Sequence, residues 1–387
     1  MAGDWSSDVC SSDLRNSIMR KIVLACIAAL LSSTLTHAQK SEVTYKSKQP
    51  YKSWVKMAPK LNDDFFKTKE AIRIGDNVLL YQQTTGGWPK NIYIPAELDE
   101  KERKEVLSEK DDVNQSTIDN TATTTEITYL SRLYNATGIE KYKKAAIKGI
   151  RYLFEAQYDN GGWPQFYPRP TGYYTHITYN DDAMINVMEL LQDIANDKAP
   201  YTYLPEDIRK QAQAAVDKGI ECILHTQVKQ NGKLTVWCAQ HDEHTLAPAK
   251  ARAYELPSLS GAESDNIVLF LMNLPHPSPE IIASIEGAVN WFKQVQINGL
   301  KREYFTNDEG QKDYRMIPCQ EGEACDPLWA RFYTLEDNRP FFCDRDGIKR
   351  YDLSEIGHER RNGYSWYNNG GLKVFKKYEQ WKKKLKN

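Results

Sequence analysis

The sequence predicts a mainly α-helical protein, an (α/α) toroid in which long loops and short strands form a groove. Two observations predict this fold. First, the loop GGWPK at 86–90 returns as GGWPQ at 161–165. Second, a glutamine followed by a glycine-containing loop recurs in weaker form at 227–232 and 294–299. A period of about 70 residues indicates one structural unit used several times. Paired helices that alternate with long loops favour a toroid over a solenoid.

Apolar residues at helical spacing predict the helices of this repeat. In chain order, the predicted helices are 68–83, 116–134, 140–157, 181–196, 206–227, 263–273 and 279–294. Asn180 or Asp181 is the expected N-cap of the fourth helix. A short strand is predicted at 234–238. The stretch 307–363 is loop-rich and dense in charged and aromatic residues, and long ordered loops in a compact domain are usually functional.

The N-terminus is predicted to carry a secretion signal. A basic start at 19–21 precedes an apolar run at 22–35, and Ala38 precedes the expected cleavage point. The run is too short to anchor the protein in a membrane. Residues 1–38 are therefore interpreted as a dubious extension plus a signal peptide that starts at Met19. A polar N-terminal arm follows at 39–60 and a single toroid domain at 61–387. The protein is expected to be secreted or periplasmic.

Charge and cysteine content exclude two kinds of partner. The formal net charge is −1 and no block of like charges is present, which argues against binding to duplex nucleic acid. Five cysteines follow residue 38, and no CxxC or Cys/His spacing indicates zinc. Because five is odd, at least one thiol stays free. Cys319 and Cys325 enclose a short polar loop and are the best candidate pair. The others are Cys222, Cys238 and Cys343.

Two acidic clusters lie at predicted helix starts. Asp119 follows Thr117 and Ile118, where it could cap the helix or interact with its dipole. The segment HITYNDDAM at 176–184 contains two adjacent carboxylates beside an asparagine. Such oxygens suit a hard cation assembled from distant segments, and they equally suit a helix N-terminus. The residues alone leave both interpretations open.

Two further clusters contain arginines. The segments WCAQHD at 237–242 and ARAYE at 251–255 place Arg252 in a loop, where a guanidinium could bind a carboxylate-bearing ligand or join a surface ion pair. Arg339 and Arg345 lie among carboxylates, so they could bind an acidic sugar or neutralise their own loop. No serine in a nucleophile elbow, no P-loop and no GxGxxG motif is present.

Taken together, these segments resemble the pectate lyases of polysaccharide lyase family 10. The matches run in one order over residues 80–350: GGWPK at 86–90, NGGWPQFYP at 160–168, HITYNDDAM at 176–184, WCAQHD at 237–242, ARAYE at 251–255 and NRPFFCDRDG at 338–347. The resemblance implies an (α/α)3 toroid. It also implies calcium-dependent β-elimination of de-esterified homogalacturonan (polygalacturonate), which gives products with a 4,5-unsaturated non-reducing end.

The resemblance also implies roles for single residues. Arg252 matches the catalytic base, Asp119 and Asp181 match aspartates linked to Ca²⁺, and Arg339 matches a substrate-binding arginine. The expected walls of the substrate subsites are Lys90, Asn91, His176, Tyr254 and Arg345. An arginine base is unusual, because arginine is normally always protonated. Nearby cations would lower its pKa, so an alkaline optimum is expected.

Two other functions compete with the lyase. An inverting (α/α) glycoside hydrolase would use Asp119 and Asp181 as acid and base around a water, without calcium and without a double bond in the product. A non-catalytic uronate-binding protein would leave the polymer intact. We expect a monomer that binds polygalacturonate. The sequence does not distinguish endo from exo action or define methyl-ester tolerance, and it assigns no role to Arg169 or to the segment 307–326.

Overall fold

The computed structural model describes residues 50–169 and 171–385, so the predicted signal peptide and the first half of the predicted arm lie outside the described residues. The helices are α2 (Pro50–Met57), α3 (Lys69–Tyr81), α4 (Glu100–Ser108), α5 (Thr124–Thr137), α6 (Glu140–Ala156), α7 (Ala183–Ala195), α8 (Glu206–Thr226), α9 (Glu263–Leu271), α10 (Pro279–Gln294), α11 (His358–Gly363) and α12 (Gly371–Leu385). All of the predicted helices are present. Helices α2, α4, α11 and α12 were not predicted. Helix α4 has no apolar stripe, because it buries no residue.

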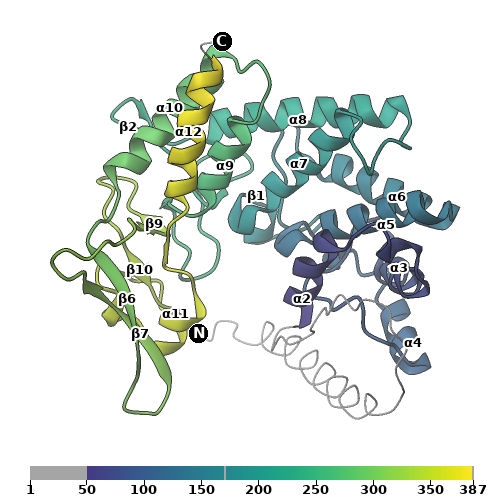
Figure 1. The fold of residues 1–387 in the computed structure, drawn as a ribbon, viewed down its shortest axis with the longest axis horizontal. Helices are drawn as coiled ribbons and strands as arrows, with labels where there is room; N and C mark the ends of the chain where they lie inside the picture. The colour runs from purple at the N-terminus through teal and green to yellow at the C-terminus, as the bar shows by residue number, and fades with distance from the viewer. Residues whose placement is uncertain (1–49, 170, 386–387) are drawn as a thin grey trace, which may run out of the picture. The chain divides into compact units, whose positions relative to one another are not determined.

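The long helices form two rows, which confirms the predicted toroid architecture. Helices α3, α6, α8 and α10 are neighbours in one row, and α5, α7, α9 and α12 are neighbours in the other. Sequential helices α5 and α6, like α7 and α8, pack side by side across the rows (Figure 1). Helices α5, α7 and α9 are the most completely buried. The turns 119–121 and 180–182 that precede α5 and α7 contact each other, and the second turn also contacts α9, so the starts of the three helices lie close together.

Buried tryptophans explain the repeated loop. Each follows a helix of the first row, is fully buried, and donates its indole N–H to a carbonyl of that helix. The bonds are Trp88 to Val78 at 2.7 Å, Trp163 to Leu153 at 2.8 Å, Trp237 to Ile223 at 2.7 Å and Trp329 to Phe292 at 2.8 Å. The last two copies lack the GGWP sequence. The repeat therefore has four members in space, although only two are obvious in the sequence.

The repeated glutamines tie neighbouring units together. In three units the side-chain amide at the helix end donates to its own loop and to a carbonyl of the next helix in the row. The bonds are Gln82 to Gly86 and Ala145, Gln157 to Gly161 and Ala215, and Gln227 to Thr235 and Ser284, all between 2.8 and 3.0 Å. Because buried carbonyls need a donor, this position requires a side-chain amide.

The described part of the predicted arm, residues 50–60, packs into the main core. Trp54 is buried, lies 5.2 Å from the ring of Tyr129, and donates to Glu126 at 2.8 Å. Met57 is buried in the same core. Lysines surround these apolar residues in the sequence and conceal their amphipathic spacing. The packed domain therefore includes residues before 61.

Short strand pairs connect the helices. The pairs are β1 (Ile177–Thr178) with β4 (Gln240–His241), β2 (Lys229–Gln230) with β3 (Lys233–Leu234), β5 (Leu259–Ser260) with β9 (Phe332–Tyr333), β8 (Trp329–Ala330) with β12 (Tyr367–Asn368), and β10 (Phe342–Cys343) with β11 (Lys349–Arg350). The strand predicted at 234–238 is wrong beyond Leu234. The longest pair is the hairpin of β6 (Leu300–Thr306) and β7 (Lys312–Pro318), which occupies much of the segment without an assigned role.

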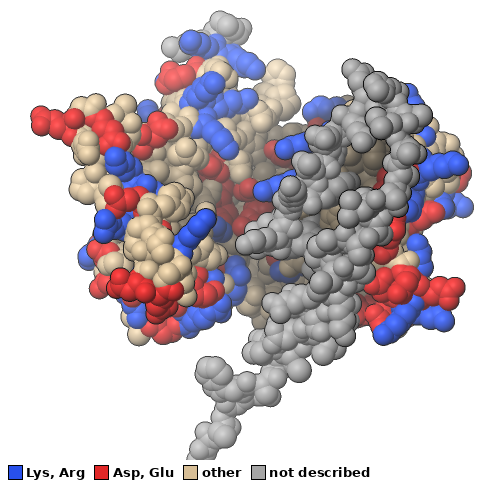
Figure 2. Space-filling model, turned by 60° about the horizontal axis from the view of Figure 1, so that its bottom comes forward, with Lys and Arg blue, Asp and Glu red and all other residues tan. Residues whose placement is uncertain are grey.

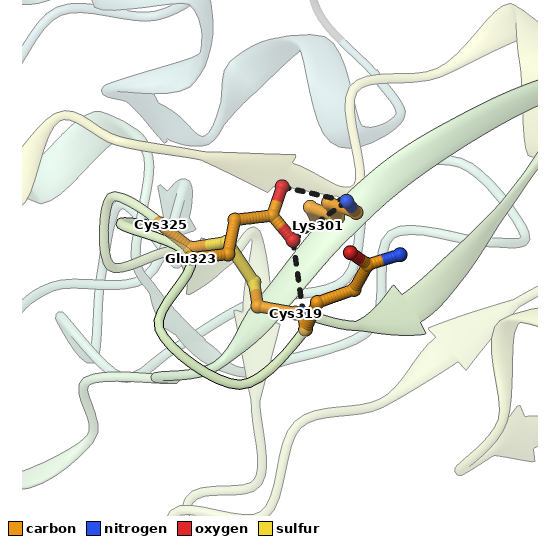
Figure 3. The surroundings of a disulfide bond; sticks show 5 residues. Lys301, Cys319, Glu323 and Cys325 are labelled. Atoms are coloured by element: carbon orange, nitrogen blue, oxygen red, sulfur yellow. Dashed lines mark hydrogen bonds and ion pairs between the residues drawn. A yellow bond between two sulfur atoms is a disulfide. The ribbon is translucent and has the colours of Figure 1, made fainter.

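The predicted disulfide between Cys319 and Cys325 is confirmed, and it closes the loop that follows β7 (Figure 3). Within this loop Glu323 pairs with Lys301 of β6 at 2.6 Å. Cys222, Cys238 and Cys343 are free and buried. Over the described ranges, no helix is long and apolar enough to cross a membrane.

Charged side chains are unevenly distributed on one face of the molecule. On the face shown in Figure 2, Asp and Glu side chains line the hollow in the middle, and Lys and Arg side chains stand along its edges. Exposed acidic groups that face inward repel one another unless a cation lies among them. This face therefore requires a closer account of its carboxylates.

Candidate active site

The chain enters α5 and α7 through two similar turns in the left-handed region. Asn120 has a φ of 53° and Asp181 a φ of 51°, and in each case the next residue, Thr121 or Asp182, is also left-handed. Residues with a Cβ rarely adopt this conformation, and it persists where the surrounding structure enforces it. Such paired outliers at equivalent helix starts suggest a functional constraint.

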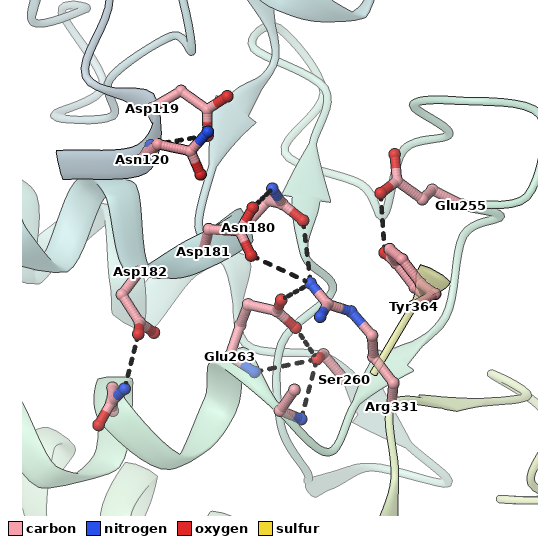
Figure 4. Close-up of polar contacts among 12 residues, drawn as sticks. Asp119, Asn120, Asn180, Asp181, Asp182, Glu255, Ser260, Glu263, Arg331 and Tyr364 are labelled. Carbon is pink, nitrogen blue, oxygen red and sulfur yellow. Dashed lines mark hydrogen bonds and ion pairs between the residues drawn. The ribbon is translucent and has the colours of Figure 1, made fainter. Parts of the chain in front are cut away.

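Neither Asp119 nor Asp181 caps a helix, so the capping interpretation is wrong. Helix α5 begins after Thr123, and α7 follows Asp182 without a side-chain capping bond. The left-handed turns direct the two carboxylates away from the helix ends and toward one region (Figure 4). Both aspartates therefore keep oxygen atoms for other partners.

Lys90 and Asn91, which are expected to form a wall of a substrate subsite, lie beside Asp119. The buried Asp119 carboxylate accepts from Lys90 Nζ at 2.5 Å and from the Asn120 N–H at 3.0 Å. The Asn120 amide donates to Asn91 Oδ1 at 2.9 Å. Lys90 also lies over the Phe166 ring. The first GGWPK loop therefore supplies a cation that compensates Asp119.

A second carboxylate group consists of Asp181, Asp182 and Glu263 (Figure 4). Its central cation is Arg331, which was not predicted. Its Nη2 contacts Glu263, lies 3.2 Å from Asn180 Oδ1 and lies 3.6 Å from Asp181 Oδ1. Burial opposes the charge of Arg331, but Glu263, Tyr364, Asp181 and Glu255 together outweigh burial and raise the arginine pKa. Arg331 is thus a permanent charge that positions both acidic side chains.

Arg331 occupies the position that Lys90 has in the first repeat unit. It lies two residues after the buried Trp329, and Lys90 lies two residues after Trp88. Both cations contact a carboxylate at the start of a second-row helix. Because the last tryptophan lacks the GGWP sequence, this equivalence emerges only from the structure.

The second carboxylate group has more acidic than basic members. Burial, together with the charges of Glu263 and Asp265, raises the pKa of Asp182 to about 7. Asp182 accepts from Asn266 at 2.8 Å. Arg331 alone contacts Asp181 and Glu263 as a cation within the described chain. Hard oxygens with an uncompensated negative charge are the ligands that Ca²⁺ prefers, so the donor set fits this ion.

The protein provides only part of a cation site around Asp119 and Asp181. Among residues that the structure describes, no group of three His, Cys, Asp or Glu ligands includes either aspartate. One such group combines His176, Asp242 and Glu243, and the other combines Glu323 with the two disulfide cysteines. Further oxygens would therefore have to come from a ligand or from solvent.

Arg252 lies in a paired arrangement with Glu255. Its Nε donates to Glu255 at 2.8 Å, a second bond joins Nη2 to the same carboxylate, and the Tyr364 hydroxyl donates to Glu255 at 2.8 Å. Burial lowers the pKa of Arg252, but the bonds to Glu255 outweigh burial and raise it. Arg252 can therefore become neutral only if the surroundings of the Arg252–Glu255 pair change.

Tyr254 and Arg345 belong to an aromatic and cationic cluster next to Arg252. The Tyr254 ring is buried, with the guanidinium groups of Arg360, Arg252 and Arg345 at 4.4, 5.1 and 5.9 Å from its centroid. Arg345 also pairs with Glu359 at 3.1 Å. Tyr254 thus supports the arginines, and it offers little surface of its own.

His176 and Arg339 have contacts outside both carboxylate groups. His176 Nδ1 lies 2.9 Å from Glu243, whose carboxylate also accepts from Thr175. Arg339 is exposed and stacks on the Tyr351 ring at 3.5 Å. No contact recorded among the described residues joins either side chain to Asp119, Asp181 or Arg252. The structure therefore does not bring His176 or Arg339 into contact with Asp119, Asp181 or Arg252.

Two rows of helices, with carboxylates and arginines gathered at one end, define an (α/α) toroid protein suited to acidic ligands. A profile of the Pectic acid lyase family matches residues 82–375. The Family 10 polysaccharide lyase from Cellvibrio cellulosa is 36% identical, with a TM-score of 0.67 over 86% of this chain and 96% of that chain. A point mutant of that lyase, in complex with trigalacturonic acid, gives a TM-score of 0.68 at 36% identity, over 86% and 97% of the two chains. No curated protein matches.

The chain belongs to the pectic acid lyase family and is similar to polysaccharide lyases of family 10. It is a lyase that acts on a polysaccharide. This result confirms the resemblance inferred from the ordered motifs, and it favours the lyase over the hydrolase and the non-catalytic binding protein.

Proposed function

We propose that this lyase cleaves de-esterified homogalacturonan (polygalacturonate) by calcium-dependent β-elimination. The supporting observation is the pair of carboxylates of Asp119 and Asp181, which converge from equivalent left-handed turns (Figure 4). The complex of the Cellvibrio mutant with trigalacturonic acid supports the substrate class. Each cleavage leaves a 4,5-double bond on the new non-reducing end.

Asp119 and Asp181 would hold the Ca²⁺ ion. Because their surroundings form only part of a ligand shell, a uronate carboxylate of the substrate would complete it. When bound, the ion supplies positive charge that stabilises the negative charge developing next to C5. Arg331 acts as a positioning residue, since it holds Asp181 and Glu263 at fixed places.

Arg252 would remove the proton from C5 while the glycosidic oxygen on C4 leaves. In the free protein Glu255 favours the charged guanidinium. A Ca²⁺ ion nearby would weaken that preference, because a like charge disfavours the charged guanidinium. The fraction of neutral Arg252 grows with pH, so the rate should rise toward alkaline pH.

The remaining basic and polar residues would bind the uronate chain. Lys90 and Asn91 lie beside Asp119, Arg345 lies beside Arg252, and Arg339 and His176 would contact more distant sugars. Tyr254 supports the arginines. An exported monomer fits this role, because the polymer cannot enter a cell intact. The membrane and nucleic acid are not expected partners.

The test is the ultraviolet absorbance of the unsaturated product during incubation with polygalacturonate. A rise that stops with chelator and returns with Ca²⁺ supports the proposal. Asp181→Asn should lower the rate at least about 100-fold, as expected when a ligand or charge at the reacting centre is lost. Asp193→Asn is the matched control, since Asp193 lies at the far end of the same helix and pairs only with Lys198.

Three outcomes would overturn all or part of this function. New reducing ends without absorbance would indicate hydrolysis. A rise in absorbance that is insensitive to chelator would retain the lyase and remove calcium from the mechanism. A pH–rate profile that peaks below neutrality would remove Arg252 from the role of base.

A further inference from the structure

One face of the β6–β7 hairpin is built differently from the other. Side chains alternate along paired strands, so Arg302 and Tyr304 share a face with their partners Met316 and Tyr314. On the opposite face Glu303 pairs with Arg315 at 2.6 Å. The opposite face therefore neutralises its own charge, whereas the first face presents a single arginine among aromatic rings.

Two cavities open on the first face. They have volumes of ≈ 470 and ≈ 370 Å³, and Arg302 and Tyr304 line both. The larger one is also lined by the disulfide loop of Cys325, where Glu323 is already occupied by Lys301. The smaller one has Arg302 as its only charged lining residue. A volume of this size accommodates one or two sugar rings.

The guanidinium of Arg302 is held in place without an acidic partner. It lies 4.6 Å from the centroid of the Tyr314 ring, and its Nη1 donates to the Tyr304 hydroxyl at 3.2 Å. No carboxylate of the described residues forms an ion pair with it. By contrast, the matched Arg315 is paired with Glu303. Arg302 is therefore pre-organised, with its remaining N–H groups available for an anion.

A second, independent feature also indicates a ligand. Tyr314 is only 5% exposed and lines the smaller cavity, yet its hydroxyl has no hydrogen-bond partner in the described structure. Buried polar groups are nearly always satisfied. A hydroxyl-rich ligand in this cavity would supply the missing partner.

The lining also fits a sugar ring. Tyr304 is 71% exposed, so its ring can lie against the apolar face of a pyranose. Asn362 and Ser365 border the same cavity and can bond to hydroxyl groups. A cation, an exposed aromatic ring and small polar side chains together match a sugar acid better than a neutral sugar or a lipid.

One residue links the lining of this cavity to the candidate active site. Tyr364 lines the smaller cavity, and its hydroxyl donates to the Glu255 carboxylate that holds Arg252. A polymer that occupies the active site thus has a basic cavity within reach on the adjoining surface.

We propose that the hairpin face of Arg302, Tyr304 and Tyr314 is an accessory binding site for a uronate residue of the polysaccharide. The ligand is a sugar carboxylate bound to Arg302, with its ring against Tyr304. The inference deepens the proposed function, since the uronate specificity rests on it. This site holds the polymer and takes no part in bond cleavage.

The test is affinity electrophoresis through gels that contain polygalacturonate, with chelator present and with Arg252→Ala as the parent so that the polymer stays intact. Arg302→Ala should weaken retention roughly fivefold to tenfold, the effect expected for one charge-assisted contact. Tyr304→Ala, at an exposed position, should weaken it similarly. The matched control Arg315→Ala should migrate like the parent. A gel with neutral hydroxyethylcellulose should retard none of them.

The outcomes separate the two proposals. Equal retention of Arg302→Ala and Arg315→Ala overturns the accessory site, and so does equal retardation in the neutral gel. If the wild type forms no unsaturated product but retention still depends on Arg302, the proposed function fails and the accessory site stands. If unsaturated product forms and retention ignores Arg302, only the accessory site fails.

Discussion

The repeated helices and the loop-rich C-terminal part position their charges in different ways. In the helices, Asp119, Asp181 and Glu263 lie at the starts of α5, α7 and α9, where buried tryptophans and glutamines fix the backbone. In the C-terminal part, Arg331 and Arg345 are held by carboxylates and aromatic rings. Acidic positions therefore follow from backbone geometry, and basic positions follow from side-chain pairing.

This difference has a practical meaning for variants. The backbone at a helix start keeps its place when a partner of its carboxylate is removed, whereas the side chain of an arginine held by a carboxylate does not. Changes to the buried tryptophans and glutamines of the helical part should therefore appear mainly as lost stability. Changes among the arginines should depend strongly on how deeply each ion pair is buried.

The largest effect is expected for Arg331→Met. The substitution leaves Glu263 buried without its cation, and a broken buried pair typically costs about 3–5 kcal/mol. Urea unfolding monitored by tryptophan fluorescence would measure this loss. The double variant Arg331→Met with Glu263→Gln should recover most of it. A loss below about 1 kcal/mol in the single variant would show that the pair contributes little.

Glu126→Gln should change how stability depends on pH. Burial raises the pKa of Glu126 from 4.5 to about 7, although Trp54 donates to its carboxylate. The folded state thus keeps a proton that the unfolded state releases. This contribution is present below pH 4.5 and is lost as pH rises through 7.

The glutamine variant does not titrate, so its stability relative to the wild type should grow between pH 4.5 and 7. The gain should reach at most about 3 kcal/mol, since one pKa unit corresponds to about 1.4 kcal/mol. Unfolding curves at several pH values provide the measurement. A difference that stays constant with pH would mean that Glu126 keeps an ordinary pKa.

Gln157→Ala tests the bonds between repeat units. It removes the donor to the carbonyls of Gly161 and Ala215, and unpaired buried groups cost about 1–3 kcal/mol. Gln213→Ala is the matched control, because Gln213 bonds only to the exposed Asp217 and should change stability by less than about 0.5 kcal/mol. Equal thermal stability of the two variants would argue against this role of the repeated glutamine.

The smallest effect on stability is expected for Arg345→Ala. Its pair with Glu359 is well exposed, with both side chains more than 60% accessible, and such pairs contribute about 0–1 kcal/mol. Thermal unfolding should therefore be nearly unchanged. A large loss would show that the stability of the fold requires Arg345 as it requires Arg331. The effect of an arginine substitution would then not depend on how deeply its ion pair is buried.

The sequence was sufficient for most of the helical part. Apolar spacing located the helices, and the repeated Gln and Trp exposed the unit from which they are built. It also located Lys90, Asn91 and Asp119, which the structure brings together. Helix starts were less predictable. The left-handed turns at Asn120 and Asp181 delay α5 and α7, and neither residue is a glycine that would have signalled them.

The C-terminal part was less predictable for a physical reason. Arg331 acquires its partners from Asn180, Asp181 and Glu263, which are distant in the chain, so no local pattern marks it. The β6–β7 hairpin was similarly hidden, since its strands are polar and largely exposed and alternate weakly. Long-range pairing of side chains leaves few local traces in a single sequence.

The hydrogen bonds at the repeated tryptophans have a consequence for modularity. The carbonyls of Trp88, Trp163 and Trp237 accept from the backbone N–H groups of Thr117, Thr178 and Ser260 at 3.1, 3.0 and 2.8 Å. The same backbone hydrogen bond therefore joins the two ends of each intervening loop. The loops differ widely in length, yet their ends meet the scaffold identically. Such a chain can exchange one loop without re-registering its helices. The toroid therefore provides fixed attachment points for variable loops. Replacing residues 89–116, 164–177 or 238–259 could introduce a new polymer specificity.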